Sequence, residues 1–137
     1  MENLYLGGII LEDNLKPYGR QLQRLENCVE QFRQIHREIR PQTCLTFLVV
    51  GRRTPISILE LSQELGVAQS SASRNVQYLL EANLLETWVD QQDRRKRMVK
   101  LTPKGEGFAK LLASTIDPPG GAEEPNGNDY QPARSGI

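Results

Sequence analysis

The sequence predicts a mainly α-helical protein that carries one small β-hairpin. Two patterns support this fold class. Apolar residues recur at helical spacing in five segments that Pro or Gly residues separate, and apolar and polar residues alternate in two short segments between 85 and 101. The chain has 137 residues, of which 38% are hydrophobic and 25% charged. These values suit one small domain with tails.

The first helical segment, residues 17–39, opens at Pro17, whose fixed φ suits a first helical turn. Its apolar and semi-polar residues are spaced by three and four, as in a heptad seam: Leu15, Tyr18, Leu22, Leu25, Val29, Phe32, His36 and Ile39. Such a seam needs a partner. The second segment, residues 41–51, opens at Pro41 and ends at Gly51. It is apolar on most sides, so we expect it to be buried.

Residues 54–57 favour a short strand, and residues 58–66 a helix that ends at Gly66. Ile58, Leu61 and Leu65 share one face of that helix. The following helix, within residues 67–85, has two distinct faces. Its buried stripe comprises Ala72, Val76, Leu79 and Leu80. Its polar face comprises Ser70, Ser73, Arg74, Gln77 and Glu81. A helix ending in Gly, a tight turn and a second helix with a slim polar face form the helix-turn-helix pattern.

Residues 85–89 and 97–101 alternate like the two strands of a hairpin. Thr102 then suits an N-cap and Pro103 a first helical residue, so residues 103–116 form the last helix. The apolar face of that helix comprises Phe108, Leu111, Leu112 and Ile116. The complete prediction is a winged helix-turn-helix, mainly α with a small β wing, flanked by N- and C-terminal helices whose apolar faces need burial.

Positive charge is concentrated in the hairpin. The chain holds 17 Lys/Arg and 17 Asp/Glu and is formally neutral, but residues 20–113 hold 15 and 10, a net charge of +5. Five cations fall within seven positions: Arg94, Arg95, Lys96, Arg97 and Lys100. A run of like charges gains little from solvent alone, so a merely solubilising turn fits poorly. The local charge indicates a polyanionic partner.

The polar helix face and the basic turn together indicate double-stranded DNA as that partner. The helix fits a major groove about 12 Å wide, where Arg74 is the candidate for bidentate contact with guanine. The candidate recognition residues are Gln69, Ser70, Ser71, Ser73, Arg74, Asn75 and Gln77. Alone, such a stripe is equally well explained as a solvated helix face. The wing favours DNA, because its cations suit phosphates or the minor groove. The candidate wing residues are Asp93, Arg94, Arg95, Lys96 and Arg97.

The segment "ELSQELGVAQSSASRNVQYLLEANLLETWVDQQDRRKRMVKLTPKGEGFAKLL" resembles the MarR family of winged-helix regulators. The most specific parts are "DRR" in the wing and "LTPKG" at the start of the next helix. The resemblance implies that Asp93 orients Arg95, which enters the minor groove. It also implies a homodimer that binds a pseudo-palindrome and controls transcription, most often as a repressor. The candidate interface residues are Leu15, Tyr18, Leu22, Leu25, Val29, Phe108, Leu111 and Leu112.

Two features depart from the family pattern. Ala68 stands before the recognition helix, where the family usually has a capping Ser or Thr, and this costs on the order of 1 kcal/mol. An acidic, Pro- and Gly-rich tail replaces the usual further C-terminal helix. We therefore expect an N-terminal arm at 1–15, the domain at 16–116 with its wing at about 85–101, and a disordered tail at 117–137.

The same residues are also compatible with two other functions. One alternative is a replication, partition or architectural DNA-binding protein of a mobile element, and another is a winged helix that binds proteins. An enzyme is not expected, because no paired carboxylates, nucleophile–base set or phosphate-binding Gly loop occurs. Neither a cofactor nor a metal is expected, and no small-molecule effector can be named. The absence of a long apolar run and of a basic leader predicts a cytoplasmic, nucleoid-associated protein.

Single residues with chemical potential have more ordinary interpretations. Cys28 falls mid-helix near the seam, and Cys44 falls on the second helix, which is expected to be buried. Buried cysteines usually act as small hydrophobes, and a redox role is the less favoured alternative. His36 falls on the seam and is interpreted as a packed, hydrogen-bonded residue. Tyr78 and Trp88 are interpreted as core residues rather than as stacking platforms.

Overall fold

The computed structural model describes residues 5–6, 9–10 and 15–118. A two-residue ribbon of β1 (Tyr5–Leu6) and β2 (Ile9–Ile10) is followed by a 3₁₀ turn, η2 (Lys16–Tyr18), and α1 (Gly19–Ile35). Then come α2 (Pro41–Arg53), β3 (Ile56–Ser57), α3 (Ile58–Leu65) and α4 (Gln69–Glu81). The hairpin of β4 (Leu85–Val89) and β5 (Arg97–Leu101) leads into α5 (Pro103–Ile116). The predicted fold class, mainly α with a small β wing, is confirmed.

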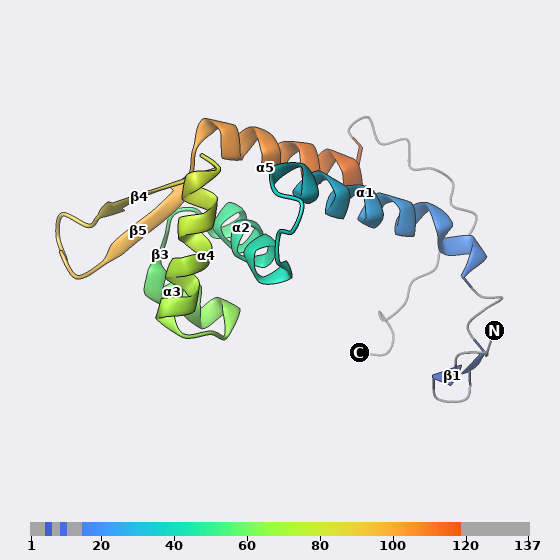
Figure 1. Cartoon of the computed structure of the whole chain (residues 1–137), viewed down its shortest axis with the longest axis horizontal. Coiled ribbons are helices and arrows are strands. Elements are labelled where there is room, and N and C mark those ends of the chain that lie inside the picture. Colours follow the sequence, from blue (N-terminus) through green and yellow to red (C-terminus); the bar gives the residue numbers. More distant parts are fainter. Residues whose placement is uncertain (1–4, 7–8, 11–14, 119–137) are drawn as a thin grey trace.

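The hairpin lies on one side of the molecule, beside α3 and α4, and α1 extends to the opposite side (Figure 1). Figure 1 shows the β4–β5 hairpin projecting on one side, while α1 continues past the end of α5 on the other. The three strands form an antiparallel sheet in the order β3-β5-β4. Thus β5 pairs on one edge with the strand that precedes the helix-turn-helix, and on the other with the outer strand of the wing.

Three aromatic rings join the flanking helices to the helix-turn-helix. Phe32 of α1, Phe47 of α2 and Phe108 of α5 contact one another edge to face, with centroid distances of 5.3 to 6.0 Å. Around them the core contains Val50, Leu61 and other aliphatic residues of α3, α4 and the sheet. This continuous core places α5 directly over α1 and α2.

The prediction that the first helix reaches residue 39 is wrong, because α1 ends at Ile35 and His36 is extended. The backbone N–H groups of Glu38 and Ile39 bond to His36 instead of continuing the helical pattern, so a turn replaces the last predicted helical turn. A turn closed by the Ile39 N–H donating to the His36 carbonyl reverses the chain. His36 is exposed; its Nδ1 accepts from the Glu38 N–H, and its ring meets Tyr78 edge to face.

The second helix also differs from its prediction. It passes through Gly51 to Arg53 and stops before Thr54, the residue that precedes Pro55. Burial is confined to one stripe that includes Phe47 and Val50, whereas Leu45 and Leu48 are exposed. The expectation of burial on most sides is therefore wrong.

Two aromatic residues expected in the core lie at the surface. Tyr78 on α4 and Trp88 on β4 are both exposed. The Lys100 ammonium lies over the Trp88 ring, 5.5 Å from its centre, so the ring makes a cation–π contact at the surface and is not part of the core. The proposed tail falls almost entirely outside the described residues, as does most of the N-terminal arm.

Candidate nucleic-acid interface

The first helix of the helix-turn-helix is firmly fixed at both ends. The Ser57 hydroxyl accepts from the Glu60 N–H, and the Glu60 carboxylate accepts from the Ser57 N–H, which makes a capping box. Gly66 ends the helix at a φ of 69°, a left-handed conformation that glycine adopts without strain. The chain then turns sharply into α4, whose preceding residue Ala68 offers no capping side chain.

The outer face of α4 is polar and exposed, and its inner face is buried. The structure places Ala72, Val76 and Leu79 in the core. The exposed candidates are Gln69, Ser70, Ser73, Arg74 and Gln77. The Gln77 amide donates to Glu81 one turn further on. The face therefore offers hydroxyls, amides and one guanidinium on a narrow surface, which suits a DNA groove.

Two candidate recognition residues lie apart from that face. Ser71 and Asn75 are half-buried. The Asn75 amide is engaged with α2, since its Oδ1 accepts from Thr43 Oγ1 at 3.0 Å and its Nδ2 donates to Gln42 Oε1 at 3.2 Å. The structure thus gives the Asn75 amide partners within the protein, and the base contact that the sequence suggests stays a prediction.

The wing tip holds Arg95 in the arrangement that the resemblance implies. The Asp93 carboxylate accepts from the Arg95 backbone N–H at 3.1 Å and from its Nε at 3.2 Å. Two backbone bonds close the turn, from the Lys96 N–H to the Asp93 carbonyl and from the Asp90 N–H to the Lys96 carbonyl. The Arg95 side chain nevertheless stays 91% exposed. Asp93 therefore orients a guanidinium whose other nitrogens face solvent.

The remaining wing cations divide into two groups. Arg97 donates to the Thr87 hydroxyl, and Lys100 pairs with Glu86 at 3.6 Å, so both side chains reach from β5 across to β4. Arg94, Arg95 and Lys96 lie at the exposed tip. The outward positive charge is thus concentrated in three consecutive residues.

The sheet brings the wing beside the helix-turn-helix. Ser57 pairs with Met98 of β5, which places the cap of α3 two residues from Lys96. Hydrogen bonds from the Ser57 N–H and hydroxyl hold the pKa of Glu60 below its ordinary value, and the charges of Lys96 and Arg53 contribute further. The stability that this shift contributes is present above the ordinary carboxyl pKa and is lost as the pH falls through the folded-state pKa.

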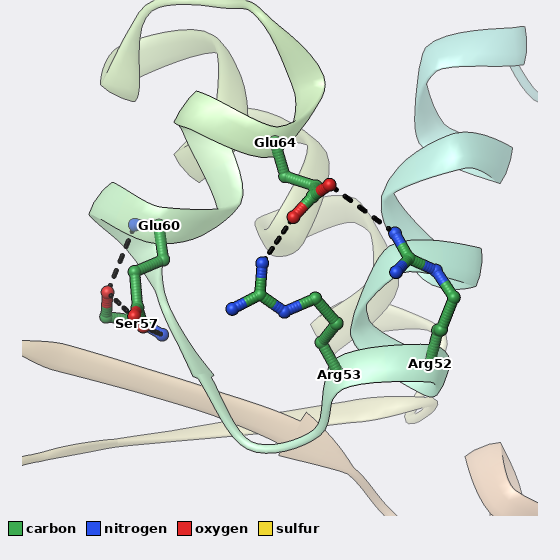
Figure 2. A network of polar contacts seen from close by, with 5 residues as sticks. All are labelled: Arg52, Arg53, Ser57, Glu60 and Glu64. Atoms are coloured by element: carbon green, nitrogen blue, oxygen red, sulfur yellow. Dashed lines mark hydrogen bonds and ion pairs between the residues drawn. The ribbon is translucent and has the colours of Figure 1, made fainter.

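An ion-pair network joins α2 to α3. Glu64 receives Arg53 on one carboxylate oxygen and Arg52 on the other, the latter at 3.6 Å (Figure 2). The Arg53 hydrogen bond, followed by the charges of both arginines, lowers the pKa of Glu64. The two arginines that end α2 are therefore engaged in positioning α3.

The expected dimer residues separate into exposed and internal sets. The structure exposes Leu15, Leu22, Leu25, Val29 and Leu111. Tyr18 is half-buried, whereas Phe108 and Leu112 pack inside the chain against Phe32 and Cys28. An apolar stripe along the free side of α1 thus remains on the surface, as the heptad seam predicts in part.

The cysteines have the features of packing residues. Cys28 is buried and its thiol donates to the Leu112 carbonyl. Burial raises the pKa of the Cys28 thiol. Burial also raises the pKa of the Cys44 thiol, and a backbone hydrogen bond there lowers it by a smaller amount. A raised pKa disfavours the reactive thiolate. Within the described residues, no group of three or more His, Cys, Asp or Glu side chains could hold a metal, and no helix is long and apolar enough to cross a membrane.

The fold and this arrangement define a winged helix-turn-helix protein. A model of the MarR family matches residues 39–96, from the turn before α2 to the tip of the wing, so the resemblance to that family is confirmed over this region. No curated protein sequence matches the chain significantly.

Solved structures support the same fold. A crystal structure of RV1404 from Mycobacterium tuberculosis aligns with a TM-score of 0.63 at 20% identity, covering 85% of this chain and 78% of that one. A crystal structure of an S. aureus MepR–DNA complex aligns at 0.59 and 20%, covering 73% and 78%. A structure of reduced AbfR bound to DNA aligns at 0.54 and 16%, covering 77% of each chain. At these identities the likeness establishes the fold.

Proposed function

We propose that the protein is a transcriptional regulator that binds double-stranded DNA sequence-specifically as a homodimer and represses the promoter it occupies. The observation that carries this proposal is the pairing of Asp93 with a 91% exposed Arg95 on a wing anchored beside α4. A guanidinium held by one carboxylate and otherwise open is suited to a narrow minor groove, where the negative potential is strong.

The two parts of the interface would divide the task. The cations of the wing tip would supply salt-dependent affinity for phosphates, and the outer face of α4 would read base edges in the major groove. Arg74 is the candidate for the guanine contact, because its guanidinium can donate to both O6 and N7 of one guanine. The MepR and AbfR structures that share this fold hold DNA, which is consistent with this use of it.

A second copy is the proposed partner of the stripe on α1. Leu22, Leu25 and Val29 are all exposed, and Val29 reaches 60%. Helical spacing places them on one side of α1, next to the side that packs on α5. Two winged domains joined through this surface would address two half-sites of a pseudo-palindrome.

The decisive experiment selects a preferred duplex from a random-sequence pool with the full chain and compares its affinity with that of unselected duplex. Fluorescence anisotropy at several salt concentrations supplies the affinities. A strong preference together with a steep salt dependence would support the regulator. Binding without preference would favour an architectural DNA-binding protein, and no binding at low salt would leave a protein-interaction module.

Arg95→Ala is expected to weaken binding to the selected duplex about tenfold and to reduce the slope of log K against log salt by roughly one. The loss follows from removing one exposed cation that a carboxylate has already oriented. Arg97→Ala is the matched comparison, because that guanidinium bonds Thr87 along the strand and should matter less. Equal losses for the two variants would contradict a special role for Arg95.

A further inference from the structure

The side chain of Asn75 joins the recognition helix to α2 through both atoms of its amide. Oδ1 accepts from Thr43 Oγ1 at 3.0 Å, and Nδ2 donates to Gln42 Oε1 at 3.2 Å. Thr43 is only 2% exposed, so its hydroxyl has little access to water and depends on this acceptor. Because the oxygen of the amide accepts one bond and its nitrogen donates the other, the two bonds together fix the orientation of the Asn75 side chain.

Besides these two bonds, α4 is held by the packing of its apolar stripe in the core. Its first turn has no side-chain cap, and its buried stripe consists of Ala72, Val76 and Leu79. Aliphatic burial is non-directional, whereas hydrogen bonds require a defined distance and angle. The amide of Asn75 is therefore the polar contact that can define how far α4 is rolled against α2.

Asn75 immediately follows Arg74, so the two side chains leave the helix about 100° apart. A roll of α4 that breaks the amide contacts would turn Arg74 and Ser73 by the same angle. Bidentate base contacts tolerate little misalignment, since productive geometry requires placement within roughly 0.5 Å and 10–20°. Phosphate contacts by long cations are less demanding.

The other end of α2 is fixed as well. Arg52 and Arg53 at its C-terminal end hold Glu64 of α3 (Figure 2), while Gln42 and Thr43 at its N-terminal end hold α4. The helix α2 thus makes polar contacts at both ends, to α4 at its N-terminal end and to α3 at its C-terminal end. The Asn75 contacts can control the orientation of the polar face of α4 only if α2 itself is held in place. The buried side chains Phe47 and Val50 hold α2 in the core, and the arginine pair adds a surface link to α3.

We propose that Asn75 is a positioning residue for sequence recognition, which sets the roll of α4 through Thr43 and Gln42 without contacting a base. This inference rests on the proposed DNA-binding function. It assigns to Thr43, a residue of a different helix, a share in sequence discrimination.

The test compares Asn75→Ala, Thr43→Val and the double variant of the full chain, each on the selected duplex and on unselected duplex. Each single variant is expected to bind the selected duplex about tenfold more weakly, with unchanged affinity for unselected duplex and an unchanged salt slope. The double variant should be no worse than either single variant, because the two residues act as one unit. Thr43→Ser, which keeps the hydroxyl, should restore discrimination.

The control is Asn27→Ala, which removes a comparable amide hydrogen bond, with Gln23, on the exposed side of α1. It should leave both affinities unchanged. A loss confined to Asn75→Ala, with Thr43→Val unaffected, would overturn the proposal and indicate direct base contact. Lower thermal stability without lost discrimination would overturn it in favour of a purely structural role. Failure of the proposed function is distinguishable, because the unaltered protein would then show no preference at all.

Discussion

Leu25→Glu is expected to convert the protein from a dimer to a monomer and to weaken binding to a duplex with two half-sites by about 100-fold. The carboxylate would enter the centre of the exposed apolar stripe on α1, where a dimer would have to bury it without a partner. Losing the link between two reading domains removes their effective concentration at the second half-site, which is worth roughly 10²–10⁴ in affinity. Sedimentation velocity and anisotropy would measure the two effects.

Gln23→Glu is the matched control for this variant. It introduces the same charge two residues away, on the exposed polar side of α1, where Gln23 bonds Asn27. It should remain dimeric and bind DNA normally. A Leu25→Glu protein that stays dimeric would place the interface elsewhere, and an unaltered protein that is already monomeric would rule out this part of the proposed function.

Periodicity predicted the elements of the domain because each one follows a local rule. The position of Gly66, the Thr102–Pro103 pair and the alternation in 85–89 depend on residues that lie close together in the chain. The end of α2 differs from its prediction because Thr54 precedes Pro55 and such a residue avoids the helix, so this rule would have placed the end at Arg53. The same rule does not find the end of α1, because the predicted end at residue 39 already lies before Arg40 and Pro41. The helix stops at Ile35 since the next residues form a turn, which apolar periodicity does not report.

Residues of the candidate site were harder to predict where the protein uses polar groups internally. A helical wheel places Asn75 at the edge of the polar face of α4, and only tertiary packing shows that α2 engages its amide. A signal was present in α2, since Thr43 and Thr46 fall on the same face as Phe47 and Val50. Thr46 satisfies its hydroxyl on the Gln42 carbonyl within its own helix, whereas Thr43 bonds to another element.

The seam of α1 gave a single pattern for two different surfaces. Phe32 belongs to the core of the protomer, whereas Leu25 and Val29 lie on the free side of the same helix. A heptad pattern reports that residues are apolar, not which neighbour covers them. The distinction required α5, which occupies one side of α1 and leaves the other exposed.

The structure explains why a glycine ends the motif "LTPKG". A Cβ built on Gly105 would lie 2.1 Å from the Leu84 carbonyl oxygen, which also accepts from the Thr102 N–H. A side-chain rotation cannot relieve this clash, because the obstructing atom belongs to the backbone. The start of α5 therefore rests directly on the chain that leaves α4 for the wing.

Gly105→Ala is accordingly expected to lower the free energy of unfolding by about 2–4 kcal/mol, as overpacking against a rigid neighbour does. Helix propensity alone predicts the opposite sign, since alanine is favoured over glycine by about 1 kcal/mol in a helix interior. Gly107→Ala is the matched control, because the same helix carries Gly107 where a Cβ meets nothing within 4 Å. It should stabilise the protein by roughly 0.5–1 kcal/mol. Urea denaturation of both variants separates contact from propensity: two stabilised proteins would contradict the close approach of α5 to Leu84, and with it the anchoring of the wing to the last helix.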